Sequence, residues 1–147
     1  MKTLIVILII ASFLQTTILP IDLVLLVLIC RAYIKSERAN LYLAFAFGML
    51  TAHLNLINLG FQTFVYLIVV WTTGLLSGSR LAGNPFLVVP VSFLFLSFSQ
   101  LINSFINHQT MDFPKIIFTS ILALPILFLL RLWEERFIVR KEIKLRV

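Results

Sequence analysis

The chain has 147 residues, of which 61% are hydrophobic and only 12% are charged. Its mean hydropathy is +1.07, whereas a soluble domain is about half apolar and about a quarter charged. This composition excludes a water-soluble globular protein and predicts an all-α integral membrane protein. Because a helix crosses the bilayer in roughly 20 residues, residues 1–147 have room for six helices in one domain and for no separate soluble domain.

Six apolar stretches follow one another with short polar separators, and we expect each to be a transmembrane helix. The stretches are 3–18, 21–34, 40–54, 59–77, 86–106 and 114–133, and a short basic tail, 134–147, follows them. The first stretch could pass for a signal peptide, but no small-x-small cleavage pattern comes after it. We therefore expect an uncleaved first helix.

The second stretch is the shortest and leaves two interpretations open. At this length, a buried or re-entrant segment fits almost as well as a full span. Pro20 and Asp22 suit the start of a helix, where a missing N–H costs nothing and a carboxylate meets the positive helix end. Arg31 and Lys35 could snorkel to the interface and lengthen its reach. Cys30 is the only cysteine, and we expect it to be a small buried apolar side chain.

The distribution of basic residues predicts an even number of spans. With the N-terminus inside, eleven of the twelve Lys and Arg residues fall in cytoplasmic segments, and Lys115 alone lies outside. Cytoplasmic loops carry this kind of excess. We therefore expect six spans with both termini in the cytoplasm. The net charge of +6 is concentrated in the tail, which favours an anionic lipid surface over nucleic acid as its partner.

Small residues recur at helical spacing in two stretches, which indicates close helix contacts. Ala44, Gly48 and Ala52 repeat every four residues in the third stretch, and Gly74 and Gly78 do so at the end of the fourth. Small side chains let membrane helices approach closely. These residues could pack within the bundle or against a partner, although chance remains an alternative, more so for the Gly74 and Gly78 pair.

The fifth stretch carries a polar stripe that must face protein or a wet cavity, because an amide in hydrocarbon needs a partner. Its members are Ser99, Gln100, Asn103 and Asn107, with Ser92 and Ser104 nearby. The stripe fits either hydrogen bonds between helices or a ligand pocket or partner groove at the outer side. Asn55, Asn58 and Gln62 lie at the same expected level and could be its partners.

Residues typical of catalysis or metal binding are sparse. All six acidic residues lie at or beyond the ends of the apolar stretches, and His53 and His108 fall in the two outer loops. A metal site needs three or four ligands, so we expect no enzyme, no metal and no cofactor.

At the C-terminal end, Trp133 is typical of an interfacial anchor. Arg136, Arg140 and Lys141 belong to a basic segment that could lie on anionic lipid or bind a cytoplasmic partner.

Several short motifs together resemble one known family. They are Pro20-Ile21-Asp22-Leu23, the segment from Ala44 to Leu50, Leu59-Gly60-Phe61, and the segment from Tyr66 to Val70. With the helix count, the length and the basic tail, this pattern resembles the rod shape-determining protein MreD family along most of the chain.

The resemblance implies a non-enzymatic scaffold in the bacterial cytoplasmic membrane that supports peptidoglycan synthesis and cell shape. Its implied partners are an MreC-like protein and, further, MreB-like, RodA-like and penicillin-binding transpeptidase proteins. The implied six-helix fold is also similar to the substrate-binding subunits of energy-coupling-factor transporters. A vitamin-type small-molecule-binding subunit is therefore the alternative. Transporter subunits of that type usually have a small-x-x-x-small face in their first helix. Here only Ala11 and Ser12 are small in that helix, which favours the scaffold.

Overall fold

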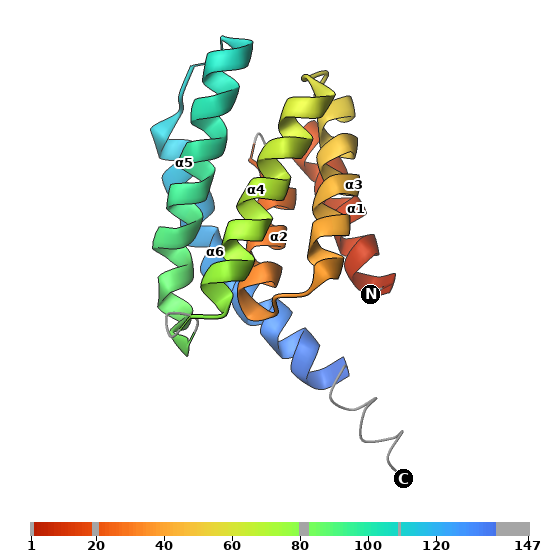
Figure 1. The fold of residues 1–147 in the computed structure, drawn as a ribbon, viewed down its shortest axis with the longest axis vertical. Helices are drawn as coiled ribbons and strands as arrows, with labels where there is room; N and C mark the ends of the chain where they lie inside the picture. Colours follow the sequence, from red (N-terminus) through yellow and green to blue (C-terminus); the bar gives the residue numbers. More distant parts are fainter. Residues whose placement is uncertain (1, 19–20, 80–82, 109, 138–147) are drawn as a thin grey trace.

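The computed structural model describes residues 2–18, 21–79, 83–108 and 110–137, and the elements formed by these residues are all helical (Figure 1). In chain order they are α1 (Lys2–Thr17), α2 (Leu23–Ile34), α3 (Arg38–Leu54), α4 (Leu59–Ser77), the 3-10 turn η2 (Pro85–Leu87), α5 (Val88–Asn107) and α6 (Phe113–Phe137). The predicted all-α class is confirmed, and each predicted apolar stretch overlaps one of the α-helices.

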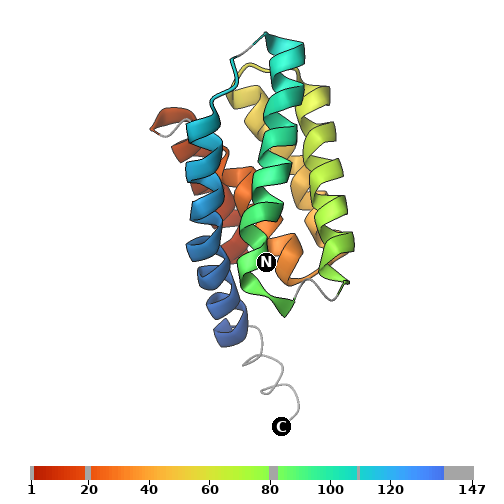
Figure 2. The same ribbon diagram turned by 90° about the vertical axis from the view of Figure 1, so that its left-hand side faces the viewer.

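The shortest helix, α2, forms the centre of the bundle. Ten of its twelve residues, Val24 to Tyr33, are buried, and α4 and α6 pack most extensively against it while α1, α3 and α5 complete its surroundings (Figures 1 and 2). Twelve residues give a helix about 18 Å long, which is well short of the roughly 30 Å hydrocarbon core of a bilayer. Because its neighbours cover it, α2 needs no match to that thickness.

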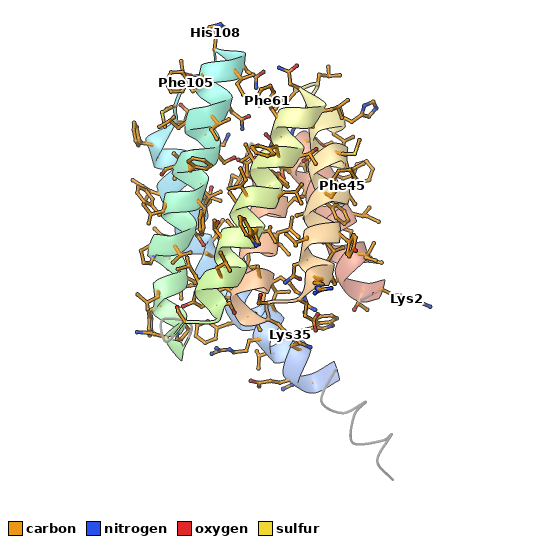
Figure 3. The ribbon with its side chains drawn as sticks, in the orientation of Figure 1. Lys2, Lys35, Phe45, Phe61, Phe105 and His108 are labelled. Atoms are coloured by element: carbon orange, nitrogen blue, oxygen red, sulfur yellow. The ribbon has the colours of Figure 1, made fainter. Side chains whose placement is uncertain are left out.

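Among the described residues, three helices are long and apolar enough to cross a membrane: Leu59–Ser77, Pro85–Asn107 and Phe113–Arg136. α1 and α2 are apolar but shorter. Large apolar side chains cover the outside of the bundle, and Phe45, Phe61 and Phe105 point away from it (Figure 3). Soluble monomers rarely expose apolar surface on this scale. The helices therefore associate with a membrane and turn this surface to lipid.

α3 and α4 form the most extensive helix pair, and their contact depends on small residues. A Cβ atom added at Gly48 would lie 3.0 Å from the Thr63 Cα and 3.4 Å from the Tyr66 Cβ. Ala44 and Ala52 are fully buried on the same face of α3. The small-residue repeat thus lies inside the fold, where it lets two helix backbones approach closely.

The helix ends lie within two residues of the predicted ones except at the end of α6, and two of the differences have local causes. α5 begins at Val88 because Pro85–Leu87 first forms a 3-10 turn, in which the Asn84 Oδ1 accepts from the Phe86 N–H at 3.1 Å. α6 continues to Phe137, past the predicted end at residue 133. Glu134 in this extra turn is held by an ion pair to Arg31.

The two ends of the bundle differ in chemistry. The start of α1 and the end of α6 lie toward the same end (Figure 1), where Lys2 and Lys35 also lie, and His108 lies at the opposite end (Figure 3). We call the first the basic end and the second the distal end.

Candidate functional site

The main cavity of the described bundle opens at the distal end and is lined mostly by polar residues. Its volume is about 410 Å³, within the range of small-molecule pockets. Its walls come from α1, α4, α5 and α6 and from three connecting segments. The lining residues are Gln15, Thr16, Thr17, Ile18, Ile21, Asp22, Asn55, Ile57, Gln62, Gln100, Asn103, Thr110 and Lys115.

Gln15 joins the cavity to the start of the central helix. Its Oε1 accepts from the Val24 N–H at 3.2 Å, and its Nε2 donates to the Asp22 Oδ1 at 3.2 Å. The first N–H groups of a helix have no partner inside the helix, so a buried side chain from α1 supplies one here. Asp22 occupies the N-cap position of α2 but makes no side-chain capping bond. Asp22 thus lies at the helix start, as the sequence predicted, while the side-chain bond to the helix N–H comes from Gln15.

One acidic and one basic side chain line the cavity. Asp22 lies in the α1–α2 connection, where burial raises the pKa of its carboxyl and the Lys115 ammonium opposes that rise. Among the described residues, the ion pairs of the bundle involve neither Asp22 nor Lys115. Lys115 lies in the first turn of α6, where the positive helix end disfavours a cation. A negative group near the Lys115 ammonium would therefore be favourable.

Amide and hydroxyl groups beside the cavity also lack partners. The Oε1 atoms of Gln62 and Gln100 are buried without a hydrogen bond, and Gln62 as a whole is only 2% exposed. The Tyr66 hydroxyl lies near Gln15, Thr51 and Gln62, but none of these described side chains is placed to form a hydrogen bond with it. Each such group costs free energy while it stays unpaired.

The predicted polar stripe of α5 divides between the cavity and the interior. Gln100 and Asn103 line the cavity, whereas Ser99 is fully buried and its Oγ has no partner. Asn107 ends α5 outside the cavity lining, and its Nδ2 is unpaired. Of the partners considered from sequence, Asn55 and Gln62 line the cavity and Asn58 does not.

The second predicted small-residue pair lies at the basic end. A Cβ atom at Gly74 would lie 3.1 Å from the Ser36 Oγ, so α4 passes close to the α2–α3 connection. Gly78 is the exposed C-cap residue of α4, and a Cβ there would meet only the Leu75 carbonyl of its own helix, at 3.5 Å. Only the first of the two glycines lies at a contact between elements.

A buried charge cluster closes the basic end. Arg31 is 4% exposed, and its guanidinium donates to the Glu134 Oε1 at 2.9 Å and lies 3.7 Å from the Glu37 Oε2. Its guanidinium carbon also lies 6.0 Å from the ring centroid of Trp133. Arg31 therefore does not snorkel into the headgroup layer, since its charge is neutralised inside the bundle. At the exposed edge of this cluster, the hydrogen bond to Glu37 raises the pKa of Lys35.

The predicted C-terminal anchor is described only in part. Trp133 is half-buried and packs on the apolar core, and Arg136 is exposed in the last described turn of α6. Arg140 and Lys141 lie outside the described residues. His53 and His108 are both exposed in the distal segments. Among the described residues, no three His, Cys, Asp or Glu side chains gather at a spacing that could hold a metal ion.

Sequence reasoning missed Gln15, Lys115 and the pairing role of Arg31. Gln15 is the only amide in the first apolar stretch, and Lys115 is the only basic residue assigned to the outer side. Each of these two residues stands out in the sequence for this reason. Their convergence with Asp22 was not visible, because it depends on how α1, α2 and α6 pack.

Comparison with known proteins does not assign the chain to a family. No family model, no curated protein and no solved structure matches it. The resemblance to the MreD family therefore stays a prediction.

Proposed function

We propose that this chain is a non-enzymatic scaffold of the bacterial cell-elongation machinery, a role that its resemblance to the MreD family implies. In this role it binds the transmembrane helix of an MreC-like protein and works with MreB-like, RodA-like and penicillin-binding transpeptidase proteins. It resides in the cytoplasmic membrane with six spans. Its basic end, including both termini, faces the cytoplasm.

The observation that carries this proposal is the projecting end of α6. At the basic end, α6 extends past α2, α3 and α4 (Figure 1). The ion pair between Arg31 and Glu134 ties this extension to the central helix. The exposed side chains Glu135 and Arg136 follow directly. A helix fixed at its base and exposed at its tip suits the presentation of a binding surface to another protein.

The orientation is supported by the distribution of charge between the two ends. Lys2 and Lys35 are exposed at the basic end, and cytoplasmic segments of membrane proteins are enriched in basic residues. The short helices α1 and α2 are compatible with six passes because α2 is enclosed by protein, while Lys2 can extend the reach of α1 by snorkelling.

Depletion of the protein and affinity purification test this proposal. Depletion is expected to round rod-shaped cells, and an MreC-like protein is expected to co-purify in mild detergent. Truncation after Arg136 is expected to weaken cytoplasmic contacts but leave membrane insertion intact, because the apolar helices are complete by that point. Lys2→Gln removes a positive charge from the same end without altering α6 and serves as the control. Normal cell shape after depletion, or a truncated chain that recovers every partner, would contradict the scaffold role.

A further inference from the structure

The distal cavity is lined by two ionisable side chains of opposite charge type that form no ion pair with each other. Asp22 and Lys115 both line it, and they interact electrostatically without forming an ion pair. Both side chains are partly buried, and burying a charge is costly unless it is paired. Each side chain therefore retains the capacity to pair with a charge placed in the cavity.

The two side chains come from different parts of the bundle. Asp22 is held by the 3.2 Å bond from Gln15 on α1 and belongs to the α1–α2 connection. Lys115 belongs to the first turn of α6. Asp22 directly precedes α2 and Lys115 belongs to a helix that packs against it, and α2 is the most deeply buried helix of the bundle.

We propose that the distal cavity binds a small zwitterion, with a primary ammonium group against Asp22 and an anionic group against Lys115. The anion also meets the positive end of the α6 helix, which offsets the unfavourable position of Lys115. The ammonium has three donors, enough to reach both the carboxylate and an amide oxygen such as that of Gln62 or Gln100. At about 410 Å³, the cavity suits a molecule of roughly amino-acid or ethanolamine-phosphate size with bridging water.

Other ligand chemistries match the cavity less well. A simple anion would pair with Lys115 but leave the Asp22 carboxylate uncompensated. A simple cation would pair with Asp22 but leave the Lys115 ammonium uncompensated. A neutral polyol could satisfy the amides of Gln62, Gln100 and Asn103 but neither charge. Only a ligand with both charges pairs with Asp22 and with Lys115.

The same zwitterionic chemistry has two sources in a cell membrane. One is a free solute such as an amino acid, and the other is the ethanolamine-phosphate headgroup of phosphatidylethanolamine in the outer leaflet. Two arms of one experiment separate them. Glycine, serine and glycerophosphoethanolamine are titrated into the full-length protein in detergent by calorimetry, and native mass spectrometry follows retention of phosphatidylethanolamine against phosphatidylglycerol.

The variants Asp22→Asn and Lys115→Gln are expected to weaken binding of the preferred zwitterion at least tenfold. Lys115→Arg keeps the charge and is expected to retain most of the binding. Asn58→Ala removes an exposed amide at the same end but outside the lining, so its dissociation constant should stay within twofold of the native one. Circular dichroism establishes that each variant is folded, and if Asp22→Asn fails to fold, the comparison of Lys115→Gln with Lys115→Arg decides the matter.

The proposal is overturned if the folded native protein binds none of these zwitterions. It is also overturned if Lys115→Gln binds them as tightly as the native chain, or if phosphatidylglycerol is retained as strongly as phosphatidylethanolamine and no free zwitterion binds. These readouts are independent of the scaffold role. Loss of partner co-purification leaves the ligand measurements unaffected, and the reverse is also true.

Discussion

Replacing Gly48 with leucine should separate α3 from α4, the most extensive helix pair of the bundle. The first added atom, a Cβ, would lie 3.0 Å from a backbone atom, the Thr63 Cα. Carbon atoms in normal contact lie about 3.5–4.0 Å apart, so the helices must move apart by roughly 0.5–1 Å. The rest of the leucine side chain then has to enter the space beside Tyr66, which is fully buried.

We expect Gly48→Leu to cost about 3 kcal/mol, at the upper end of the roughly 1–3 kcal/mol measured for overpacked cores. A gap of this size forfeits about a quarter to a half of each dispersion contact along the pair. The higher helix propensity of leucine offsets less than about 1 kcal/mol of this cost. Unfolding in mixed detergent micelles, followed by circular dichroism, measures the difference.

Gly60→Leu is the matched control, because nothing lies within 4 Å of a Cβ atom at that position in the first turn of α4. It should be neutral or slightly stabilising. If Gly48→Leu unfolds at the same detergent ratio as Gly60→Leu, then the α3–α4 contact is not limited by side-chain size and the packing argument is wrong.

Three further predictions concern the buried charge, one loop and the topology. Arg31→Met leaves the carboxylate of Glu134, which is 14% exposed, without its Arg31 partner. This substitution should cost about 3 kcal/mol, the lower part of the range for a broken buried pair. The double variant Arg31→Met with Glu134→Leu should recover most of that loss in the same unfolding assay. If the single and the double variant lose the same stability, the pairing is contradicted. Leu56 has a φ of 55° and is 93% exposed. Leu56→Asn should therefore stabilise the protein by up to about 1 kcal/mol, because asparagine adopts the left-handed backbone conformation more readily. A higher melting temperature would show this gain, and a lower melting temperature would argue against backbone strain at Leu56. With Cys30 replaced by alanine, a cysteine at Asn58 should react with an impermeant maleimide from outside the cell and one at Ser79 only after permeabilisation. Labelling at Ser79 in intact cells would exclude the six-span topology.

The approximate positions of the helices could be predicted from the sequence, because hydropathy and polar separators indicate where each one lies. The stretch 59–77 coincides with α4. Hydropathy does not distinguish lipid from protein as the apolar surroundings of a side chain. α1 and α2 are both strongly apolar, yet Ile7 and Ile10 of α1 are exposed while Leu25 and Ile29 of α2 are fully buried. The central position of α2 therefore required the tertiary structure.

Only one wall of the candidate site could be predicted from the sequence. Helical spacing identified the face of α5 that carries Gln100 and Asn103, because amides in an apolar helix must find partners. The opposite wall combines Gln15, Asp22 and Lys115 from segments far apart in the sequence. No local pattern links them, since their proximity results from packing three helices around one centre.

The central position of α2 constrains the order in which the bundle can be completed. The second helix synthesised is the one that all the others enclose, and it carries Arg31, whose partner Glu134 is among the last residues of α6 to emerge. Until then, a helix too short for the bilayer must stay in the membrane with Arg31, whose guanidinium has only the longer 3.7 Å contact with Glu37. Assembly intermediates without α6 should therefore be short-lived and be substrates for membrane quality-control proteases, whereas chains that lack only the residues after α6 should escape them.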